Sequence, residues 1–545
     1  MHAKDNVRLH CNKLGPVSKT TSSVPDFLVY KKLVSIPQFF AGRSVFITGG
    51  TGFMGKVLVE RLLTTCPDIK RLILLMRSKR GVDPKNRLAD FKRSQVFDVL
   101  RKNNPAQLDK VHVLDGDITK PSLGLKDESL SSLEEVSVVF NCAATVRFDE
   151  KLNWAAQQNV LSVIYMMEIC DKLPSMKVLV HVSTAYSNAE QKEVEERVYP
   201  LPRPLDEMLA EALAVSEDAP SKYVNSIISP KPNTYTYTKM LGETAVQQHG
   251  IKTYPIAIFR PSIVLSSLRN PFPGWIDTFN GPIATVAAVS KGLLPVYYCI
   301  GKSRVDVLPV DIAIDSLIAV AWETAVDNLS TVRVYNCSTS ANPTTWEQMR
   351  SVSVHECRQN PLSDGLWYPT CMFVKNWYIY RVLNFVVRSI PLHLAQYTMQ
   401  ILKKKSRVNL IDLDRRLCQM IVIVNFFTTR DWVFRTANMT SLRLRLHHSD
   451  AAVFNLDPNA IDWKEYYANQ VRGIRRFLLK EKEENLPQSR KRLQRMYFLH
   501  QTITILVPVF LTYMLHQLRR FPLSTFYKNI KSLVKSKLNQ FLIVN

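Results

Sequence analysis

A tyrosine and a lysine four residues apart, Tyr235 and Lys239, form a pair that can transfer protons. Side chains at this spacing lie on one face of a helix, and Asn233 or Thr234 can cap such a helix at its start. A free phenol titrates at about pH 10, so Tyr235 needs a nearby cation to exchange protons near neutral pH. We therefore expect Lys239 to supply that cation, although an ordinary helix surface produces the same spacing.

Two hydroxyl side chains, Ser183 and Thr184, follow the apolar run 178–182. A hydroxyl at the end of a strand can hold a substrate carbonyl, or it can satisfy only local backbone groups. The order of the motifs favours the first interpretation. A glycine loop, this strand end and the tyrosine–lysine pair follow one another through alternating strand and helix patterns.

The glycine loop lies in segment 44–58, which predicts a strand, a phosphate-binding turn and a helix. A glycine at the first position permits a tight turn, the second lets the backbone approach a pyrophosphate, and the third lets the helix pack closely on the strand. The helix N-terminus would then face the anion. The alternative is a purely structural glycine turn. The candidate cofactor-binding residues of this loop are Thr48, Gly49, Gly52, Phe53, Met54 and Gly55.

The end of the next predicted strand, 71–76, indicates which dinucleotide binds. A protein that prefers NAD places an acidic residue here to accept a hydrogen bond from the ribose 2′-hydroxyl. This chain has a cationic cluster instead, consisting of Arg77, Ser78, Lys79 and Arg80. The cluster favours the 2′-phosphate of NADPH, and a solvated basic turn is the alternative. Asp117, after another apolar run, is a candidate partner for the adenine amino group.

These motifs together resemble the extended short-chain dehydrogenase/reductases and, within them, the fatty acyl-CoA reductases of the eukaryotic, insect-like kind. The likeness extends over roughly Ile36 to Leu479, and the C-terminal stretches make it specific to that family. The stretches that carry it are 48–56, 141–148, 181–186, 235–239, 260–264, 426–434 and 462–466.

The resemblance implies an α/β fold with a doubly wound, Rossmann-type parallel sheet. It also implies that Thr184, Tyr235 and Lys239 form the catalytic trio, with Lys239 also binding the cofactor. Asn159 matches a position that often supports a proton relay, although an Asn within a helix is more often a local hydrogen bonder. The implied reaction is NADPH-dependent reduction of a long-chain fatty acyl-CoA to a primary alcohol through an aldehyde.

Two rival interpretations use the same fold. One is a sterol or sugar-nucleotide dehydrogenase or epimerase, because such enzymes share the trio; stretch 427–466 argues against it. The other is an inactive lipid-binding membrane protein, and the intact Thr184, Tyr235 and Lys239 argue against that.

The amino-acid composition narrows the classes of partner that the protein can bind. The chain has 545 residues, enough for two domains, and a formal net charge of +24, which favours anionic cofactors, CoA phosphates or anionic membranes. It contains no compact nucleic-acid-binding module, so we expect no nucleic-acid partner. Its nine cysteines form an odd set without Cys-x-x-Cys spacing, which indicates a reducing compartment and argues against a zinc or other metal site. The sequence gives no signal for an oligomeric state.

We expect a flexible N-terminal arm at 1–35, an NADPH-binding reductase domain at 36–340 and a helical C-terminal domain at 341–480. The arm has no long apolar run and so does not resemble a secretory signal, which predicts that the catalytic domain faces the cytosol. An apolar stripe at 377–386 is interpreted as ordinary core, with a tunnel for an acyl chain as the alternative.

The far C-terminus predicts a membrane tether. Segment 496–518 has no Asp, Glu, Lys or Arg and is about long enough to cross a bilayer, although Pro508 is equally compatible with a re-entrant hairpin. Basic residues flank it on both sides, so the positive-inside rule cannot orient it. Segment 521–545 predicts a basic amphipathic helix for an anionic membrane surface, or for packing on the protein itself. We therefore expect an intracellular membrane, of the endoplasmic reticulum or the peroxisome.

Overall fold

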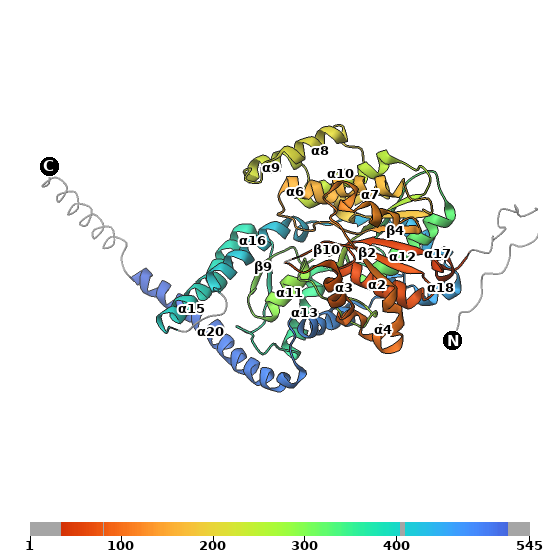
Figure 1. Ribbon diagram of the computed structural model, residues 1–545. Helices are drawn as coiled ribbons and strands as arrows, with labels where there is room; N and C mark the ends of the chain where they lie inside the picture. Colours follow the sequence, from red (N-terminus) through yellow and green to blue (C-terminus); the bar gives the residue numbers. More distant parts are fainter. Residues whose placement is uncertain (1–33, 80, 404–408, 521–545) are drawn as a thin grey trace, which may run out of the picture.

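A computed structural model of the chain describes residues 34–79, 81–403 and 409–520. The expected amphipathic helix at 521–545, Arg80 and nearly all of the expected arm at 1–35 lie outside these ranges. At the centre is a seven-stranded sheet, in which every neighbouring pair of strands is parallel (Figure 1). The strands, in their order across the sheet, are β12 (Arg333–Cys337), β7 (Ile256–Pro261), β5 (Val178–Val182), β4 (Val136–Asn141), β1 (Ser44–Thr48), β2 (Arg71–Met76) and β3 (Val111–Asp115).

The order of the strands reverses between β1 and β4, because the chain builds the sheet outward in one direction from β1 and in the other from β4. In open α/β sheets, ligands bind at such a switch point, beyond the carboxyl ends of the strands. The predicted fold class, a doubly wound parallel sheet, is confirmed.

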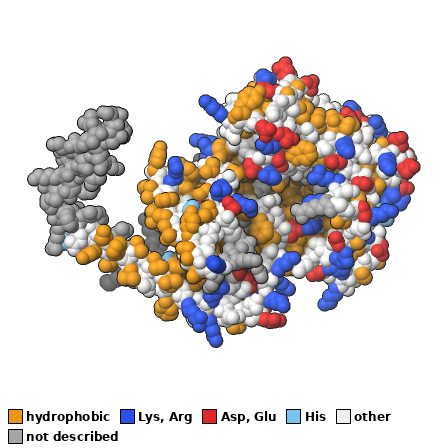
Figure 2. Space-filling model, turned by 60° about the vertical axis from the view of Figure 1, so that its left-hand side comes forward, with side chains coloured by type: hydrophobic (Ala, Val, Ile, Leu, Met, Phe, Trp, Pro, Cys, Tyr) orange, Lys and Arg blue, Asp and Glu red, His pale blue; other side chains and the backbone are white. Residues whose placement is uncertain are grey.

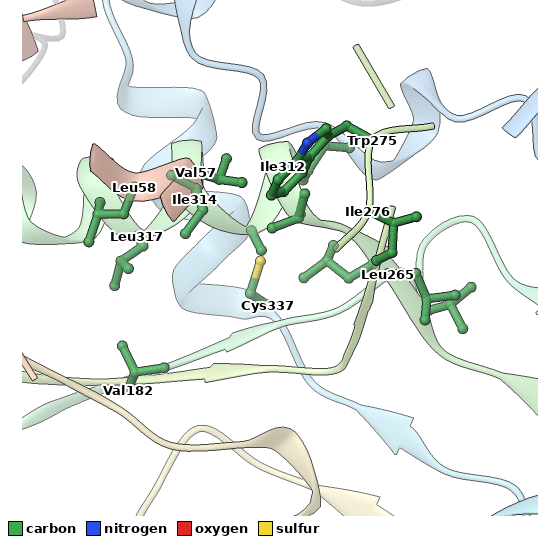
Figure 3. Close-up of a cluster of buried hydrophobic side chains, with 14 of the residues drawn as sticks. Val57, Leu58, Val182, Leu265, Trp275, Ile276, Ile312, Ile314, Leu317 and Cys337 are labelled. Carbon is green, nitrogen blue, oxygen red and sulfur yellow. The ribbon is translucent and has the colours of Figure 1, made fainter. Parts of the chain in front are cut away.

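Helices cover both faces of the sheet, which explains why its central strands are continuously apolar. Along β1, Val45 and Ile47 belong to one hydrophobic cluster and Phe46 to the cluster on the opposite face. Helices α2 (Phe53–Thr65) and α12 (Val310–Asp327) cover the first face, where their apolar side chains meet those of the strands (Figure 3). Helices α7 (Ser162–Cys170) and α10 (Thr234–His249) contribute to the second cluster.

Residues 341–480 are mostly helical, but they also pair with the first part of the chain. Three short strands of this region join strands that precede residue 341, and the larger hydrophobic cluster includes side chains from both parts. The helices that matter for the site are α13 (Trp346–Gln359), α14 (Trp377–Asn384), α15 (Ile390–Ile401), α16 (Leu410–Thr428) and α19 (Trp463–Gly473). The strand pairs are β13 (Thr344–Thr345) with β10 (Arg304–Val305), β14 (Met372–Val374) with β9 (Val296–Tyr298), and β15 (Val433–Phe434) with β6 (Glu193–Val194).

The interpretation of stripe 377–386 as ordinary core is wrong for much of its length. Tyr380 is 3% exposed, whereas Val382 is 63% and Phe385 60% exposed. Helix α14 packs with one side against β9, and no other described element covers its opposite side.

The described chain ends in the long helix α20 (Leu486–Arg520), which leaves the body at one end of the molecule (Figure 1). The helical span Glu483–Met514, which includes the 3-10 turn Glu483–Asn485 and most of α20, is the one described helix that is long and apolar enough to cross a membrane, judged by length and composition, with a mean hydropathy of 1.3. None of that window is buried against the rest of the protein.

A buried ion pair joins the sheet to the helix that carries the predicted catalytic pair. Arg260 on β7 and Glu243 on α10 are 2.6 Å apart and essentially inaccessible to solvent. The same guanidinium donates hydrogen bonds to the carbonyls of Glu195 and Arg197. Removing one partner of such a pair leaves the other charge buried and unpaired, which typically costs about 3–5 kcal/mol.

We therefore expect Arg260→Met to lower the midpoint of thermal unfolding strongly, and the added substitution Glu243→Leu to restore part of the loss. The matched control is Arg197→Met, because Arg197 and Glu195 form an exposed pair that should contribute about 1 kcal/mol at most. Equal midpoints for Arg260→Met and Arg197→Met would contradict the assignment.

Candidate active site

The loop between β1 and α2 has room for no side chain at two of its glycines. Gly49 has φ +71°, and a Cβ there would lie 2.8 Å from the backbone nitrogen of Ala143. A Cβ on Gly55 would lie 2.3 Å from the carbonyl oxygen of Gly49. Gly52 occupies the N-cap of α2 and offers no side-chain cap, so the first backbone N–H groups of the helix stay open to an anion. This cradle fits the pyrophosphate of a dinucleotide.

Thr48 holds this loop in place rather than lining a ligand site. Its hydroxyl donates to Asn141 Oδ1 at 2.7 Å and accepts a hydrogen bond from the backbone of Ala143 at 3.1 Å. Asn141 in turn lies 3.4 Å from the ring of His181. Burial lowers the pKa of that ring well below its ordinary value. The carboxyl ends of β1, β4 and β5 are therefore connected by polar side chains.

A cavity of about 730 Å³ lies at the switch point of the sheet. The glycine loop forms one wall, and the ends of β4 and β5 together with α10 form another. The predicted site residues that line this cavity are Gly49, Gly52, Phe53, Met54, Gly55, Arg77, Asp117, Thr184, Tyr235 and Lys239. Thr48 is the one predicted residue of the site that does not line it.

One end of the cavity is cationic. Arg77, Lys79 and Arg87 all line it, and Arg87 donates a hydrogen bond to the carbonyl of Arg77. Asp117 lies 3.8 Å from the Arg77 guanidinium and accepts two hydrogen bonds from Thr119. Sequence reasoning missed Arg87, which lies on α3 (Pro84–Lys92), outside the strand end where the cluster was sought. A cation on the helix that follows a basic strand end is the signal that could have found it.

The predicted catalytic side chains come together on the opposite side of the cavity. Asn233 caps α10 by accepting a hydrogen bond from the backbone of Thr236 at 2.9 Å, and the helix then presents Tyr235 and Lys239. Thr184 accepts a hydrogen bond from the backbone of Tyr186 at 3.2 Å, which leaves its own proton free to bond to the Tyr235 phenol or to a substrate.

The environment of Tyr235 differs from the expectation. Burial raises its pKa to about 12, and the hydrogen bond with Thr184 only partly opposes this effect. The direction is opposite to the one expected from Lys239, whose ammonium donates to the carbonyl of Val182 at 2.8 Å. Burial lowers the pKa of Lys239 to about 8. At neutral pH, Tyr235 therefore carries its proton and is suited to donate it.

Two other residues that the sequence analysis considered, Asn159 and Ser183, lie in different parts of the structure. Asn159 is buried outside the cavity, where its side chain binds the backbone of Thr145 and the hydroxyl of Thr238 at 3.0 Å. It thereby fixes α10 against the π-helical segment Gln157–Leu161, which carries Asn159, and against the loop at Thr145. Ser183 lines the cavity, and its buried hydroxyl has no hydrogen-bond partner among the described residues, so a ligand could supply one.

A further wall of the cavity is apolar and aromatic, and sequence reasoning assigned none of its residues to the site. Phe148 stacks on Tyr235 with ring centroids 5.8 Å apart and touches Phe427 at 5.3 Å. Phe427 lies at the end of α16, so the C-terminal region completes the wall beside the phenol. The aromatic run at 426–434 was the available signal. The other apolar lining residues of this wall include Tyr186, Tyr297, Trp346 and Val424.

Comparison with known proteins agrees with this arrangement. Two family models, both described as male sterility protein, match residues 47–317 and 387–481, and the first represents an NAD-binding domain. The cavity therefore takes a nicotinamide cofactor.

Among solved structures, the terminal R domain of the myxalamid biosynthetic pathway has a TM-score of 0.53 at 15% identity, covering 81% of this chain and 93% of that domain. A reductase domain of a nonribosomal peptide synthetase from Mycobacterium tuberculosis has a TM-score of 0.53 at 17% identity, covering 82% and 94%. These two structures share the fold.

Curated relatives are more similar. Fatty acyl-CoA reductase 1 of Xenopus laevis is 36% identical over 85% of this chain and 90% of its own length. Human fatty acyl-CoA reductase 1 is 34% identical over the same shares, and human fatty acyl-CoA reductase 2 is 32% identical over 86% of this chain and 90% of its own. The matches cover both the cofactor loop and the aromatic wall, and the chain therefore belongs to the fatty acyl-CoA reductase family.

Proposed function

We propose that the protein reduces a long-chain fatty acyl-CoA to the primary alcohol, through an aldehyde, with NADPH as its cofactor. One observation carries the proposal: Thr184, Tyr235 and Lys239 line a single cavity between a phosphate-binding loop and an aromatic wall. The loop suits a dinucleotide, and the wall suits an acyl chain. The family supplies the substrate class, because its curated members are named for acyl-CoA reduction.

The preference for NADPH rests on the cationic end of the cavity. Arg77, Lys79 and Arg87 gather where the ribose 2′-phosphate of a bound dinucleotide would lie, and guanidinium groups bind phosphate with paired hydrogen bonds. Asp117 would accept the hydrogen bond of the adenine amino group, and the glycine loop would hold the pyrophosphate. When bound, NADPH supplies the hydride for both reductions.

Side chains of the protein then stabilise the charge that develops on the substrate oxygen. Thr184 and Tyr235 would both donate hydrogen bonds to the thioester carbonyl, stabilising negative charge as it develops. Tyr235 gives up its proton to that oxygen, since its raised pKa keeps it protonated until an alkoxide forms. Lys239, still mostly protonated at neutral pH, stabilises the phenolate that is left.

Collapse of the resulting hemithioacetal returns its hydroxyl proton to the Tyr235 phenolate and breaks the carbon–sulfur bond, which releases CoA as a thiolate and leaves an aldehyde in the same cavity. Thr184, Tyr235 and Lys239 then act on the oxygen of the aldehyde in the same way during the second reduction. Cys142 lines the cavity, but burial raises the pKa of its thiol to about 12. It therefore stays protonated and takes no part as a nucleophile.

We also propose the domain boundaries: a cofactor-binding unit at 36–340 and a helical unit at 341–480. We further propose that the protein is attached to the endoplasmic reticulum or the peroxisome, with the catalytic part in the cytosol. The exposed apolar segment of α20 supports attachment to a membrane lipid phase. A long-chain alcohol partitions into the same phase.

We expect Tyr235→Phe to bind the cofactor normally and to lose reduction by a factor of roughly 10² to 10⁴, because only the proton-donating hydroxyl is removed. The matched control is Tyr237→Phe, two residues along the same helix. The Tyr237 hydroxyl is buried and has no hydrogen-bond partner among the described residues, so its loss should leave kcat nearly unchanged. Retention of more than about a tenth of kcat by Tyr235→Phe would refute the role.

We expect Arg77→Ala to weaken NADPH binding by about 1.5–3 kcal/mol, since one charge-assisted contact to the 2′-phosphate is lost, and to leave NADH binding almost unchanged. The measurement is KM for each cofactor. Arg93→Ala is the control, because Arg93 pairs with Asp90 on the exposed surface of the same region. Equal affinity of the unaltered protein for the two cofactors would exclude the assignment.

We expect carbonate and high-salt washes to leave the full-length protein in the membrane fraction, because inserted apolar segments do not depend on screened charges. Truncation before Met496 should shift the protein toward the soluble fraction. Immunoblots of the washed pellets and supernatants measure both effects. Complete release of the full-length protein by salt would exclude insertion of α20.

A further inference from the structure

A second apolar surface lies beside α20 at the same end of the molecule. It extends along α14, the π-helical turn Phe385–Ser389 and α15, and we call it the α14–α15 face. In Figure 2, hydrophobic side chains gather at this end of the body, next to the extended helix. The exposed residues of the face are Tyr378, Ile379, Val382, Phe385, Val386, Val387, Ile390, Leu394, Tyr397, Ile401 and Leu402. Monomeric soluble proteins rarely expose so long a contiguous apolar surface.

The side of these helices that faces the protein carries both apolar and polar contacts. Tyr380 of α14 packs on Tyr298 with ring centroids 5.8 Å apart, and polar side chains further along meet α16. Arg388 is 2% exposed, and its Nε donates to Asp414 of α16 at 2.9 Å. Gln396 of α15 accepts a hydrogen bond from the backbone of Leu410 at 2.9 Å. Asn384 is also buried on this side.

A helix at the surface of a soluble protein keeps its outward side polar. These helices are apolar on their outward side, even though part of their inward side is polar. The polar contacts with α16 hold α14 and α15 firmly, so the outward apolar side is not a consequence of loose packing. An apolar medium on the outside accounts for both sides of these helices.

We propose that the α14–α15 face is a membrane-binding surface, which sinks into one leaflet of an anionic phospholipid bilayer alongside α20. This contact would hold the body of the enzyme flat on the membrane, in the manner of a monotopic protein. The contact itself does not depend on the proposed reaction.

Charge at the border of the face favours anionic lipid as its occupant. Exposed cations precede, interrupt and follow the two helices and continue on α16; they are Lys375, Arg381, Lys403, Arg415 and Arg416, of which Arg415 pairs with Asp412 at 3.1 Å. Basic residues near an anionic membrane contribute roughly 1 kcal/mol each. A second copy of the chain would bring two such cationic borders together. Segment 521–545, which itself carries Lys528, Lys531, Lys535 and Lys537, would meet the same repulsion.

The attachment of α20 to the body brings the face to the same membrane. Trp367 donates a hydrogen bond to His500 at 3.2 Å, and Tyr368 packs on Tyr497 with ring centroids 5.4 Å apart. These contacts fix α20 just where its apolar part begins. Both views place this helix and the α14–α15 face at one end of the molecule (Figures 1 and 2).

Helix α16 connects the face to the cavity. Asp414 near its start holds Arg388 of the face, and Val424, Phe427 and Thr428 near its end line the cavity. If the acyl chain enters along this helix, the substrate passes from the leaflet to the catalytic residues without crossing water. This consequence, unlike the membrane contact, rests on the proposed function.

The test places an environment-sensitive fluorophore on the full-length protein, at Leu394→Cys in the face. The control carries the same label at Lys222→Cys, on the exposed helix α9 (Ser221–Ile228). Unaltered protein gives the background labelling of the native cysteines. Each protein is reconstituted into vesicles of phosphatidylcholine and phosphatidylserine, with and without lipids that carry a nitroxide quencher in the acyl chain.

We expect the emission at position 394 to shift to shorter wavelength and to be quenched by the nitroxide lipids, and the emission at position 222 to do neither. Equal, unquenched emission at both positions would overturn the proposal. A short-wavelength shift at 394 without quenching would mean that protein covers the face, either a second copy or segment 521–545, and would also overturn it. The readout does not involve catalysis, so a failure of the proposed function cannot be mistaken for a failure of the membrane contact.

A second measurement uses charge. In full-length protein whose α20 insertion is weakened by Val507→Glu and Phe510→Glu, the further pair Leu394→Glu and Tyr397→Glu should reduce flotation with the vesicles by roughly tenfold or more. The matched pair Tyr223→Glu and Asn225→Glu introduces the same charge on exposed positions of α9 and should have little effect. Equal flotation of the two variants would count against the face.

Discussion

The close approach of the glycine loop to the ends of β1 and β4 is the constraint on which the site depends. Gly55 sits so near the Gly49 carbonyl that only a hydrogen fits between them, and Thr48 ties the turn to Asn141 on the neighbouring strand. This contact places the N-terminus of α2 at the point where the strand order reverses. The phosphate cradle, the strand ends and the catalytic helix consequently surround one cavity.

The C-terminal region supports that loop from the outside. Gly473 of α19 and Gly274 approach so closely that a Cβ on Gly473 would lie 1.8 Å from the Gly274 carbonyl oxygen. The residue after Gly274, Trp275, stacks on Phe53 of the cofactor loop with ring centroids 5.5 Å apart. The region at 341–480 therefore does more than complete the aromatic wall of the cavity, because its packing also positions the first turn of α2.

Burial determines the acid–base properties of Tyr235 and Lys239, the side chains to which we assign proton transfer. Desolvation disfavours the charged form of each group, so the pKa of Tyr235 rises while that of Lys239 falls. A phenol that keeps its proton is useful in a reductase, where the substrate oxygen gains negative charge and needs a donor. The ammonium of Lys239, held by the Val182 carbonyl, lies in the same buried region and is available once that proton has left.

Sequence alone predicted the parallel sheet, the glycine loop and the membership of Tyr235, Lys239 and Thr184 in one site. The glycine loop and the Tyr235–Lys239 pair depend on local rules: the need for glycine in a tight turn and the repeat of a helix. The doubly wound sheet and the grouping of Thr184 with that pair came from the order of the motifs and from the family resemblance. The sequence alone also indicated a long apolar segment before the C-terminus.

What the sequence could not determine depends on contacts between distant residues. Arg87 joins Arg77 only because α3 folds back beside the strand end, and Phe427 reaches Phe148 only because α16 packs against β9. The direction of the Tyr235 pKa shift was misjudged because burial is a property of the folded chain. The stripe at 377–386 was taken for core because periodicity reveals that a helix has an apolar side. Which way that side faces is decided by tertiary packing, and here Tyr380 packs on Tyr298 whereas Val382 and Phe385 stay exposed.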